Sequence, residues 1–181
     1  MKQTAIIIPA RYGSSRLEGK PLLRANNKPI IQWVWEKASK CPLVDRVIIA
    51  TDDERIFNVC KDFGAEVEMT STEHKSGSDR IAEERHPEIA YIINLQGDEP
   101  LIEQANIELV IKGVLEDEKA DISTLLREIK DEDEAQNPNL VKCVFDVDNY
   151  AMYFSRSKIP YERNAGKSKI YGHLGIYGYK R

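Results

Sequence analysis

The chain has few cysteines, no long apolar run and no excess of basic residues. Its three cysteines, Cys41, Cys60 and Cys143, are dispersed without a C-x-x-C spacing, which argues against a disulfide framework and favours a reducing compartment. We expect each of them to pack in the interior. Because no apolar stretch is long enough to span a bilayer and no signal-peptide region opens the chain, we expect a cytoplasmic protein without a membrane partner.

The charge balance limits the classes of ligand that the protein is expected to bind. Lysine and arginine number 26 against 30 acidic residues, for a net charge of -4, so no general basic face for nucleic acid is expected. The cations gather in a few loops instead. That distribution favours a small anionic ligand over a polyanion.

Strand-like and helix-like segments alternate through the first two thirds of the chain. The strands are expected at residues 5–8, 47–50, 66–69, 91–95 and 122–126. The helices are expected at 30–38, at 56–63 with Gly64 as the C-cap, from Ser78, and at 103–116. This alternation predicts an α/β fold, with a mostly parallel sheet covered by helices on both faces.

The pattern changes beyond residue 131. An acidic turn is expected at 131–134, and strands at 142–147 and 150–154 flank the turn residues Asp148 and Asn149. We therefore expect a β-rich insertion after about residue 140, inside a single domain of residues 1–181.

The segment from Pro9 to Pro21 is rich in glycine, serine and cations, and it follows the expected strand at 5–8. Glycines let backbone N–H groups approach an anion, and a loop at the carboxyl end of such a strand is a place for nucleotide phosphates. The spacing is not that of a P-loop. Taken alone, the segment is either a phosphate loop or a solvated basic turn.

A carboxylate follows the expected strand at 91–95. Asp98 lies just past this strand, in Gln96-Gly97-Asp98-Glu99-Pro100, where side chains point into the ligand crevice of an open α/β sheet. Mg²⁺ is commonly held there by one or two carboxylates together with phosphate oxygens. The alternative is an aspartate that only stabilises the turn before Pro100.

Two further segments have both a functional and a purely structural interpretation. Residues 75–80 end in a helix start at which Ser78 can serve as the cap, and the turn at Gly77 could also hold a base or ribose. Arg156 follows a strand and suits an acidic substrate, or is a surface cation. His173 and Tyr177 lie four residues apart, which places them on one face of a strand, as structural residues or as part of a site.

Together these segments resemble one family from end to end. The matching blocks are Pro9–Tyr12, Ser15–Leu17, Gly19–Pro21, Ala50–Asp52, His74 with Ser76–Gly77, Asp79–Arg80, Gln96–Pro100, Asn137–Asn139, Tyr153–Arg156, Ile159–Pro160 and His173–Tyr179. In this order they resemble the 3-deoxy-manno-octulosonate (Kdo) cytidylyltransferases, also called CMP-Kdo synthetases. The blocks from Gln96–Pro100 onward separate this family from the sialic-acid cytidylyltransferases.

The resemblance implies a Rossmann-like, dimeric nucleotidyltransferase in which residues 140–181 form the substrate and dimer subregion. The transferase would convert CTP and Kdo to CMP-Kdo and pyrophosphate with Mg²⁺, for lipopolysaccharide biosynthesis. Alternatives are a related enzyme for 8-amino Kdo or sialic acid, and an inactive nucleotide-binding remnant. The remnant is considered because family members continue past the block at His173–Tyr179, so that we expect a chain truncated at its C-terminus and lacking a second metal-binding aspartate.

The resemblance also assigns roles to residues. Arg11, Arg16, Lys20 and Asp98 are the expected catalytic residues, and Asp98 the metal ligand. The nucleotide would contact Pro9, Ala10, Arg11, Ser14, Lys20, Ser76, Gly77, Arg80, Gln96 and Asp98. The sugar acid would contact Arg16, Gln96, Arg156, His173 and Tyr177. One departure stands in the phosphate loop, where Glu18 replaces the proline usual in the family.

Overall fold

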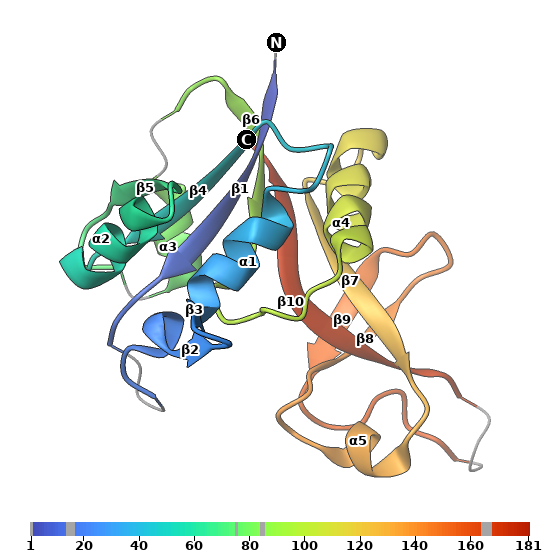
Figure 1. The fold of residues 1–181 in the computed structure, drawn as a ribbon. Coiled ribbons are helices and arrows are strands. Elements are labelled where there is room, and N and C mark those ends of the chain that lie inside the picture. The colour runs from blue at the N-terminus through green and yellow to red at the C-terminus, as the bar shows by residue number, and fades with distance from the viewer. Residues whose placement is uncertain (1, 14–16, 75, 84–85, 164–167) are drawn as a thin grey trace. The chain divides into compact units, whose positions relative to one another are not determined.

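The computed structural model describes residues 2–13, 17–74, 76–83, 86–163 and 168–181 (Figure 1). The chain divides into two compact units. The first comprises Met1–Ser123 and Ile176–Arg181, and the second Thr124–Gly175. Among the described residues, no helix has both the length and the apolar character needed to cross a membrane.

The first unit is built on a mostly parallel sheet, as the sequence predicted. Strand β1 (Gln3–Ala10) lies between β4 (Arg46–Thr51) and β6 (Ile89–Asn94) and pairs in parallel with both. Strand β5 (Glu66–Met69) continues the parallel order beyond β4. The C-terminal part of β10 (Ile170–Lys180) adds an antiparallel strand beside β6.

Helices cover both faces of this sheet, which confirms the predicted fold class (Figure 1). Helices α1 (Ile30–Ala38), α2 (Glu54–Asp62) and α4 (Gln104–Glu116) cover one face, and α3 (Gly77–Ala82) covers the other. The side chains of β1 point alternately to the two faces of the sheet, so they contribute to the core on both. Ala5 and Ile7 belong to the cluster that includes Ile81 of α3. Full burial of an isoleucine such as Ile7 contributes about 2 kcal/mol.

Local capping sets where the helices begin and end. Asp53 caps α2 by accepting a hydrogen bond from the Arg55 backbone N–H, and Gly64 ends the helix region at φ +83°, as predicted. The predicted cap of α3, Ser78, is wrong. Ser76 caps the helix, because Asp79 stands three residues after it and completes a capping box that Ser78 cannot form.

Three short elements connect β1 to α1. The 3₁₀ turn η1 (Lys20–Leu22) leads into the hairpin of β2 (Arg24–Ala25) and β3 (Lys28–Pro29). Gly19, which precedes η1, has φ +65°, a backbone conformation that favours glycine. The loop from β1 therefore returns to the sheet through a turn that glycine permits.

The second unit is β-rich and starts at Thr124. It takes in the later part of β7 (Ile122–Ile129), α5 (Glu132–Gln136), β8 (Lys142–Phe145), β9 (Ala151–Ser155) and the first part of β10. Strand β8 pairs antiparallel with both β9 and β10, and Asn149 turns the β8–β9 hairpin at φ 68°. The acidic turn predicted at 131–134 is instead the start of helix α5, because Asp131 caps it by accepting from the Glu134 N–H.

Candidate functional site

A cavity of about 380 Å³ opens in the first unit, where β1 and β6 reach their carboxyl ends. This is the edge of an open α/β sheet at which ligands bind. Pro9 and Ala10 end β1, and Gln96 to Asp98 follow β6. The lining residues are Pro9, Ala10, Arg11, Lys20, Pro21, His74, Ser76, Gly77, Arg80, Gln96, Gly97 and Asp98.

The structure brings the predicted nucleotide residues together here. Of the ten predicted positions, nine line this cavity: Pro9, Ala10, Arg11, Lys20, Ser76, Gly77, Arg80, Gln96 and Asp98. The tenth, Ser14, lies outside the described residues, and so does Arg16, which was predicted for catalysis and for the sugar acid. Three parts of the chain, within residues 9–21, 74–80 and 96–98, thus meet at one cavity. The contacts predicted for them with a nucleotide stay predictions.

Lys20 and Asp98 face each other across this cavity. The Lys20 Nζ donates to Asp98 Oδ2 at 2.6 Å, and the two side chains are 39% and 45% exposed. Asp98 is the one carboxylate among the described residues that line the cavity. A carboxylate that is in contact with a solvent-accessible hollow and with a lysine ammonium fits a divalent metal, which prefers oxygen ligands.

The base of the loop after β1 is held by Tyr12. The Gly19 N–H donates to the Tyr12 carbonyl at 2.8 Å, and a Cβ on Gly19 would come within 3.0 Å of the Tyr12 ring. The Arg55 guanidinium lies over the same ring, 3.3 Å from its centroid, and is itself held by two hydrogen bonds to Asp53. The sequence did not indicate this clamp, because its parts come from two elements.

Arg80 reaches the cavity wall from inside the protein. It is 3% exposed, its Nη2 donates to Asp52 Oδ2 at 2.6 Å, and its Nη1 donates to Thr70 Oγ1. Asp52 follows β4 and Thr70 follows β5, so the guanidinium ties together the ends of two strands and helix α3. This ion pair compensates the cost of burying the charge.

His74, Pro21 and Gly97 line the cavity but had no role in the prediction. The His74 Nε2 lies 2.6 Å from Glu83 Oε2, which also accepts from the Ser71 N–H. A Cβ on Gly97 would come within 2.9 Å of Ile31 Cδ1, so this position requires glycine for space. His74 and Gly97 both stood in blocks of the family resemblance, which is the signal that could have found them.

Two of the predicted sugar residues belong to the first unit. Gln96 lines the cavity, and its Nε2 donates to Asn94 Oδ1 at 3.1 Å. Tyr177, on β10, pairs in register with Asn94 of β6. Burial raises the pKa of Tyr177, so its hydroxyl keeps its proton near neutral pH.

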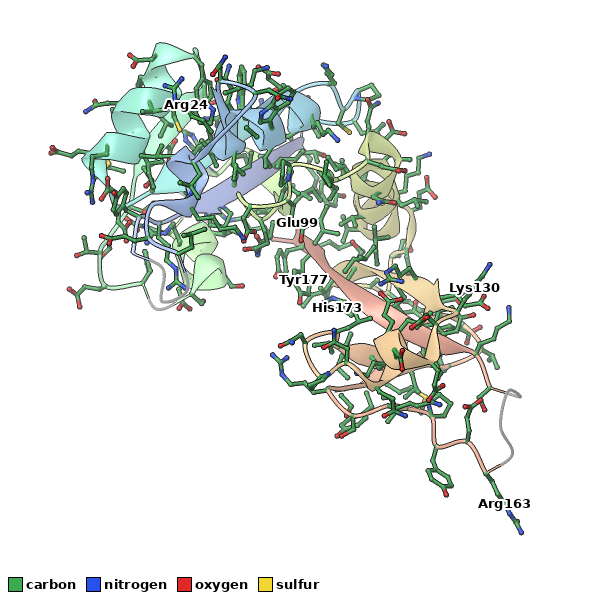
Figure 2. All side chains as sticks on the ribbon, turned by 60° about the horizontal axis from the view of Figure 1, so that its bottom comes forward. Arg24, Glu99, Lys130, Arg163, His173 and Tyr177 are labelled. Atoms are coloured by element: carbon green, nitrogen blue, oxygen red, sulfur yellow. The ribbon has the colours of Figure 1, made fainter. Side chains whose placement is uncertain are left out.

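The other two described sugar candidates, Arg156 and His173, belong to the second unit. Arg156 Nη1 donates to the Pro138 carbonyl at 2.8 Å. His173 Nε2 lies 2.9 Å from Thr124 Oγ1, and its ring meets the Phe154 ring edge to face. Burial lowers the pKa of His173, which favours the neutral imidazole. Figure 2 shows His173 and Tyr177 on the same strand, β10.

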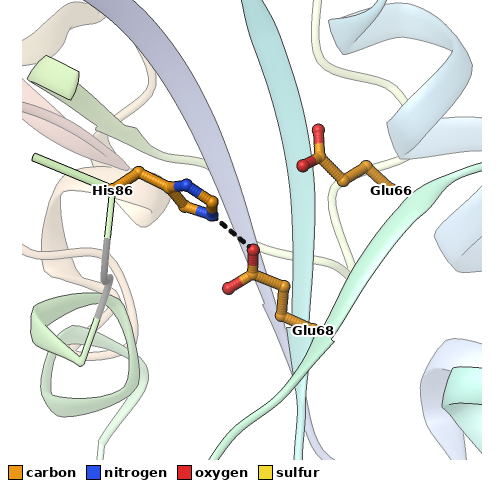
Figure 3. Close-up of side chains that lie close together, drawn as sticks. All are labelled: Glu66, Glu68 and His86. Carbon is orange, nitrogen blue, oxygen red and sulfur yellow. Dashed lines mark hydrogen bonds and ion pairs between the residues drawn. The ribbon is translucent and has the colours of Figure 1, made fainter. Parts of the chain in front are cut away.

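A second group of ionisable side chains lies at the opposite, amino end of the parallel strands. Glu66, Glu68 and His86 offer ligand atoms within 4.8 Å of one another (Figure 3). Arg46, however, donates to both oxygens of Glu66 and to Glu88, and its Nη2 lies 3.1 Å from His86 Nε2. Because the Arg46 guanidinium already contacts two members of this group, Glu66 and His86, we interpret the group as an ion-pair network that joins β4, β5 and the segment before β6.

The three cysteines pack in the interior, as predicted. Cys41, Cys60 and Cys143 are buried and free. Burial raises the pKa of the Cys60 thiol to about 12, so it is an unreactive thiol rather than a nucleophile.

Comparisons with known proteins show which proteins this chain is similar to. The family model described as Cytidylyltransferase matches residues 5–181. The 3-deoxy-manno-octulosonate cytidylyltransferase of Thermodesulfovibrio yellowstonii is 48% identical over 191 residues, which cover 97% of this chain and 74% of the relative. The Escherichia coli enzyme of the same name is 46% identical and covers 100% of this chain, again over 74% of the relative.

A solved structure is equally similar. The structure of CMP:2-keto-3-deoxy-manno-octonic acid synthetase in complex with CTP superposes with a TM-score of 0.94 at 45% identity, over 98% of this chain and 74% of that one. The match to the family model over nearly the whole chain, with the relatives of 46% and 48% identity, is decisive. The chain belongs to the cytidylyltransferase family.

Proposed function

We propose that this protein transfers a cytidylyl group from CTP to 3-deoxy-D-manno-octulosonate, forming CMP-Kdo and pyrophosphate for lipopolysaccharide biosynthesis. The observation that carries the proposal is the gathering of nine predicted nucleotide residues around one cavity at the carboxyl ends of β1 and β6. The names of the relatives at 46% and 48% identity support the same reaction.

The described residues supply positive charge where the reaction needs it. The anomeric hydroxyl of the sugar acid loses its proton to solvent as its oxygen forms a bond to the α-phosphorus, and the bond from that phosphorus to the bridging oxygen of pyrophosphate breaks. Negative charge therefore grows on the departing pyrophosphate. Arg11 and Lys20 line the cavity and stabilise this charge by electrostatic attraction, together with Arg16, which the family resemblance adds.

The metal in this proposal is Mg²⁺, held by Asp98. Asp98 would hold the metal, which would supply positive charge that stabilises the phosphates. Lys20 is the present partner of Asp98, at 2.6 Å. In the proposed complex, the lysine ammonium turns from the carboxylate to the phosphates, and the carboxylate becomes free to coordinate.

The sugar acid would be recognised through its carboxylate. Arg156, Gln96, His173 and Tyr177 are the described residues proposed for this role, with Arg16 as the fifth. A guanidinium binds a carboxylate with two parallel hydrogen bonds, which makes Arg156 the principal contact. The runner-up substrates are 8-amino Kdo and sialic acid, which carry the same carboxylate.

We propose that the protein is a homodimer that associates through β9. This strand is at the edge of the second unit, and its side chains Met152, Tyr153 and Phe154 are 71%, 61% and 41% exposed. An apolar edge strand of this kind is a surface that pairs with another chain. Sedimentation analysis should give a dimer, and Met152→Lys should shift it to the monomer; a monomeric wild-type protein contradicts the proposal.

A cytoplasmic location completes the proposal. Its support is the set of three free, buried cysteines, which is typical of proteins in a reducing compartment. Fractionation of cells that produce the protein should find it with cytoplasmic markers. Recovery in the periplasmic fraction contradicts this part of the proposal.

The test is pyrophosphate release from CTP, measured with Kdo and Mg²⁺ and with each omitted in turn. We expect release only when all three are present. The same assay over Kdo, 8-amino Kdo and sialic acid identifies the acid by its kcat/KM. Absence of release with every acid contradicts the proposed activity, while release with sialic acid alone contradicts the proposed substrate.

A further inference from the structure

The first strand residue of β8, Lys142, is buried although it is charged. Its side chain is 0% exposed, and no carboxylate among the described residues pairs with it. Its Nζ donates instead to three backbone carbonyls, those of Asn137 at 2.9 Å, Leu140 at 2.7 Å and Arg156 at 2.7 Å. An ammonium has three donors, so all of them are used. Burial of a charge is costly without such partners, which indicates that the contacts matter.

These contacts join two segments. Asn137 and Leu140 belong to the turn after α5, while Arg156 follows β9. Arg156 itself reaches back to the same turn, because its Nη1 donates to the Pro138 carbonyl at 2.8 Å. The two segments are thus tied twice, once through the backbone of Arg156 and once through its guanidinium.

The strand register places a further site candidate beside this tie. Lys142 is opposite Ser155 of β9 and Gly172 of β10, and the His173 N–H donates to the Val141 carbonyl at 2.8 Å. Arg156 and His173 each follow the residue that faces Lys142. Within the second unit, Lys142 is therefore the residue between the two proposed contacts with the sugar acid.

The charges at this place favour an anion. The Lys142 Nζ contacts the Arg156 carbonyl at 2.7 Å, so the two cations belong to neighbouring groups. Burial, together with repulsion from the Arg156 charge, lowers the pKa of Lys142. Neither has a carboxylate partner among the described residues; both donate to neutral carbonyls. A site with two close cations and no internal anion is suited to a bound carboxylate.

We propose that Lys142 is a positioning residue of the sugar-acid site: its buried ammonium fixes the backbone of Arg156 against the turn at residues 137–140, and so sets the place of the guanidinium that binds the substrate carboxylate. The inference rests on the proposed function. It adds a residue that does not touch the substrate, yet decides how well the acid is bound.

The test is a double-mutant cycle between Lys142 and Arg156, with the KM for Kdo and the KM for CTP as readouts. Lys142→Met and Arg156→Gln should each raise the KM for Kdo by about tenfold or more and change the KM for CTP by less than about twofold. In the Arg156→Gln background, Lys142→Met should raise the KM for Kdo no further, because the guanidinium it positions is gone.

Two more variants keep the test decisive. Lys169→Met removes an exposed lysine of the same unit, whose ion-pair partner among the described residues is Glu128, and should leave both KM values unchanged. Lys142→Arg keeps the charge, but a planar guanidinium cannot serve three carbonyls in the same geometry, so it should give a smaller rise. If Lys142→Met does not fold, Lys142→Arg takes its place in the double-mutant cycle.

The outcomes separate two failures. If Arg156→Gln raises the KM for Kdo and Lys142→Met adds its full effect on top of it, the positioning role is overturned while the proposed function stands. A rise in both KM values with Lys142→Met overturns the positioning role as well, because a general loss of structure would raise both values. If Arg156→Gln leaves the KM for Kdo unchanged, the contact assigned to Arg156 is wrong, and the positioning role falls with it.

Discussion

Replacing Asp98 with asparagine tests the metal-binding role of the carboxylate in the cavity. The change keeps the size of the side chain and removes its charge, and with it the 2.6 Å ion pair to Lys20. Because the two side chains are 39% and 45% exposed, that ion pair contributes only about 0.2–1 kcal/mol to stability. For a chain of this length, the midpoint of thermal unfolding should fall by less than about 4 °C.

The expected effect on turnover is much larger. Loss of a charged group that acts on a developing charge lowers kcat by about 10²–10³, which corresponds to about 2.7–4 kcal/mol. Activity and stability should thus separate, since the loss of turnover exceeds what unfolding could explain. The assay is pyrophosphate release over a range of Mg²⁺ concentrations, alongside thermal unfolding of the same preparation.

Glu99→Gln is the matched control. Glu99 is the neighbouring residue, exposed and absent from the cavity lining (Figure 2). We expect its replacement to leave turnover unchanged. If Asp98→Asn keeps more than about a tenth of the wild-type kcat, or if Glu99→Gln loses as much, the assignment of the metal to Asp98 is refuted.

Three further changes have defined outcomes. Lys20→Ala should lower kcat by about 10² while the KM for CTP changes little, and near-normal turnover in steady-state kinetics would contradict its role. Gly97→Ala should cost about 1–3 kcal/mol in urea unfolding, because the added Cβ would lie 2.9 Å from Ile31 Cδ1, whereas Gly175→Ala, which meets open space, should cost far less. Burial lowers the pKa of His173, so protonation favours the unfolded chain, and the free energy of unfolding falls as the pH drops below about 6.5. His173→Gln should make this fall smaller between pH 7.5 and pH 5. An unchanged dependence of the free energy of unfolding on pH would contradict the prediction.

Much of the first unit could be predicted from the sequence because its elements are locally consistent. The apolar run at Ala5–Ile8 is a buried strand, and the helical spacing of Ile56, Cys60 and Phe63 ends at Gly64, as the pattern indicated. The site residues gather for a topological reason: parallel strands end at one edge, so loops that follow them meet there. That is why Lys20 and Asp98, 78 residues apart, are in contact.

Two local predictions from the sequence were wrong, because other hydrogen bonds formed in their place. The cap of α3 was assigned to Ser78, but Ser76 has the acidic partner Asp79 at the spacing that a capping box needs. The acidic turn at 131–134 forms helix α5, since an aspartate cap and the apolar contact of Ala135 with Ile129 outweigh the charge of the segment. In both cases the same residues could form several local hydrogen bonds, and the sequence alone does not show which of them forms.

Long-range contacts were beyond prediction from pattern alone. The Arg55 guanidinium over Tyr12, the Asp52–Arg80 ion pair and the burial of Lys142 each depend on how separate elements pack. A lysine in a short strand is ordinarily expected at the surface. Only the fold reveals that its ammonium is enclosed by carbonyls from two segments.

The most direct test is a crystal structure of the protein with CTP and Mn²⁺, which marks the metal position by its anomalous signal. The account predicts the triphosphate in the cavity between the loop after β1 and the segment after β6, with phosphate oxygens within hydrogen-bond distance of Lys20 Nζ and the anomalous peak on the Asp98 carboxylate. A nucleotide bound elsewhere on the protein, or a metal that does not contact Asp98, would contradict it.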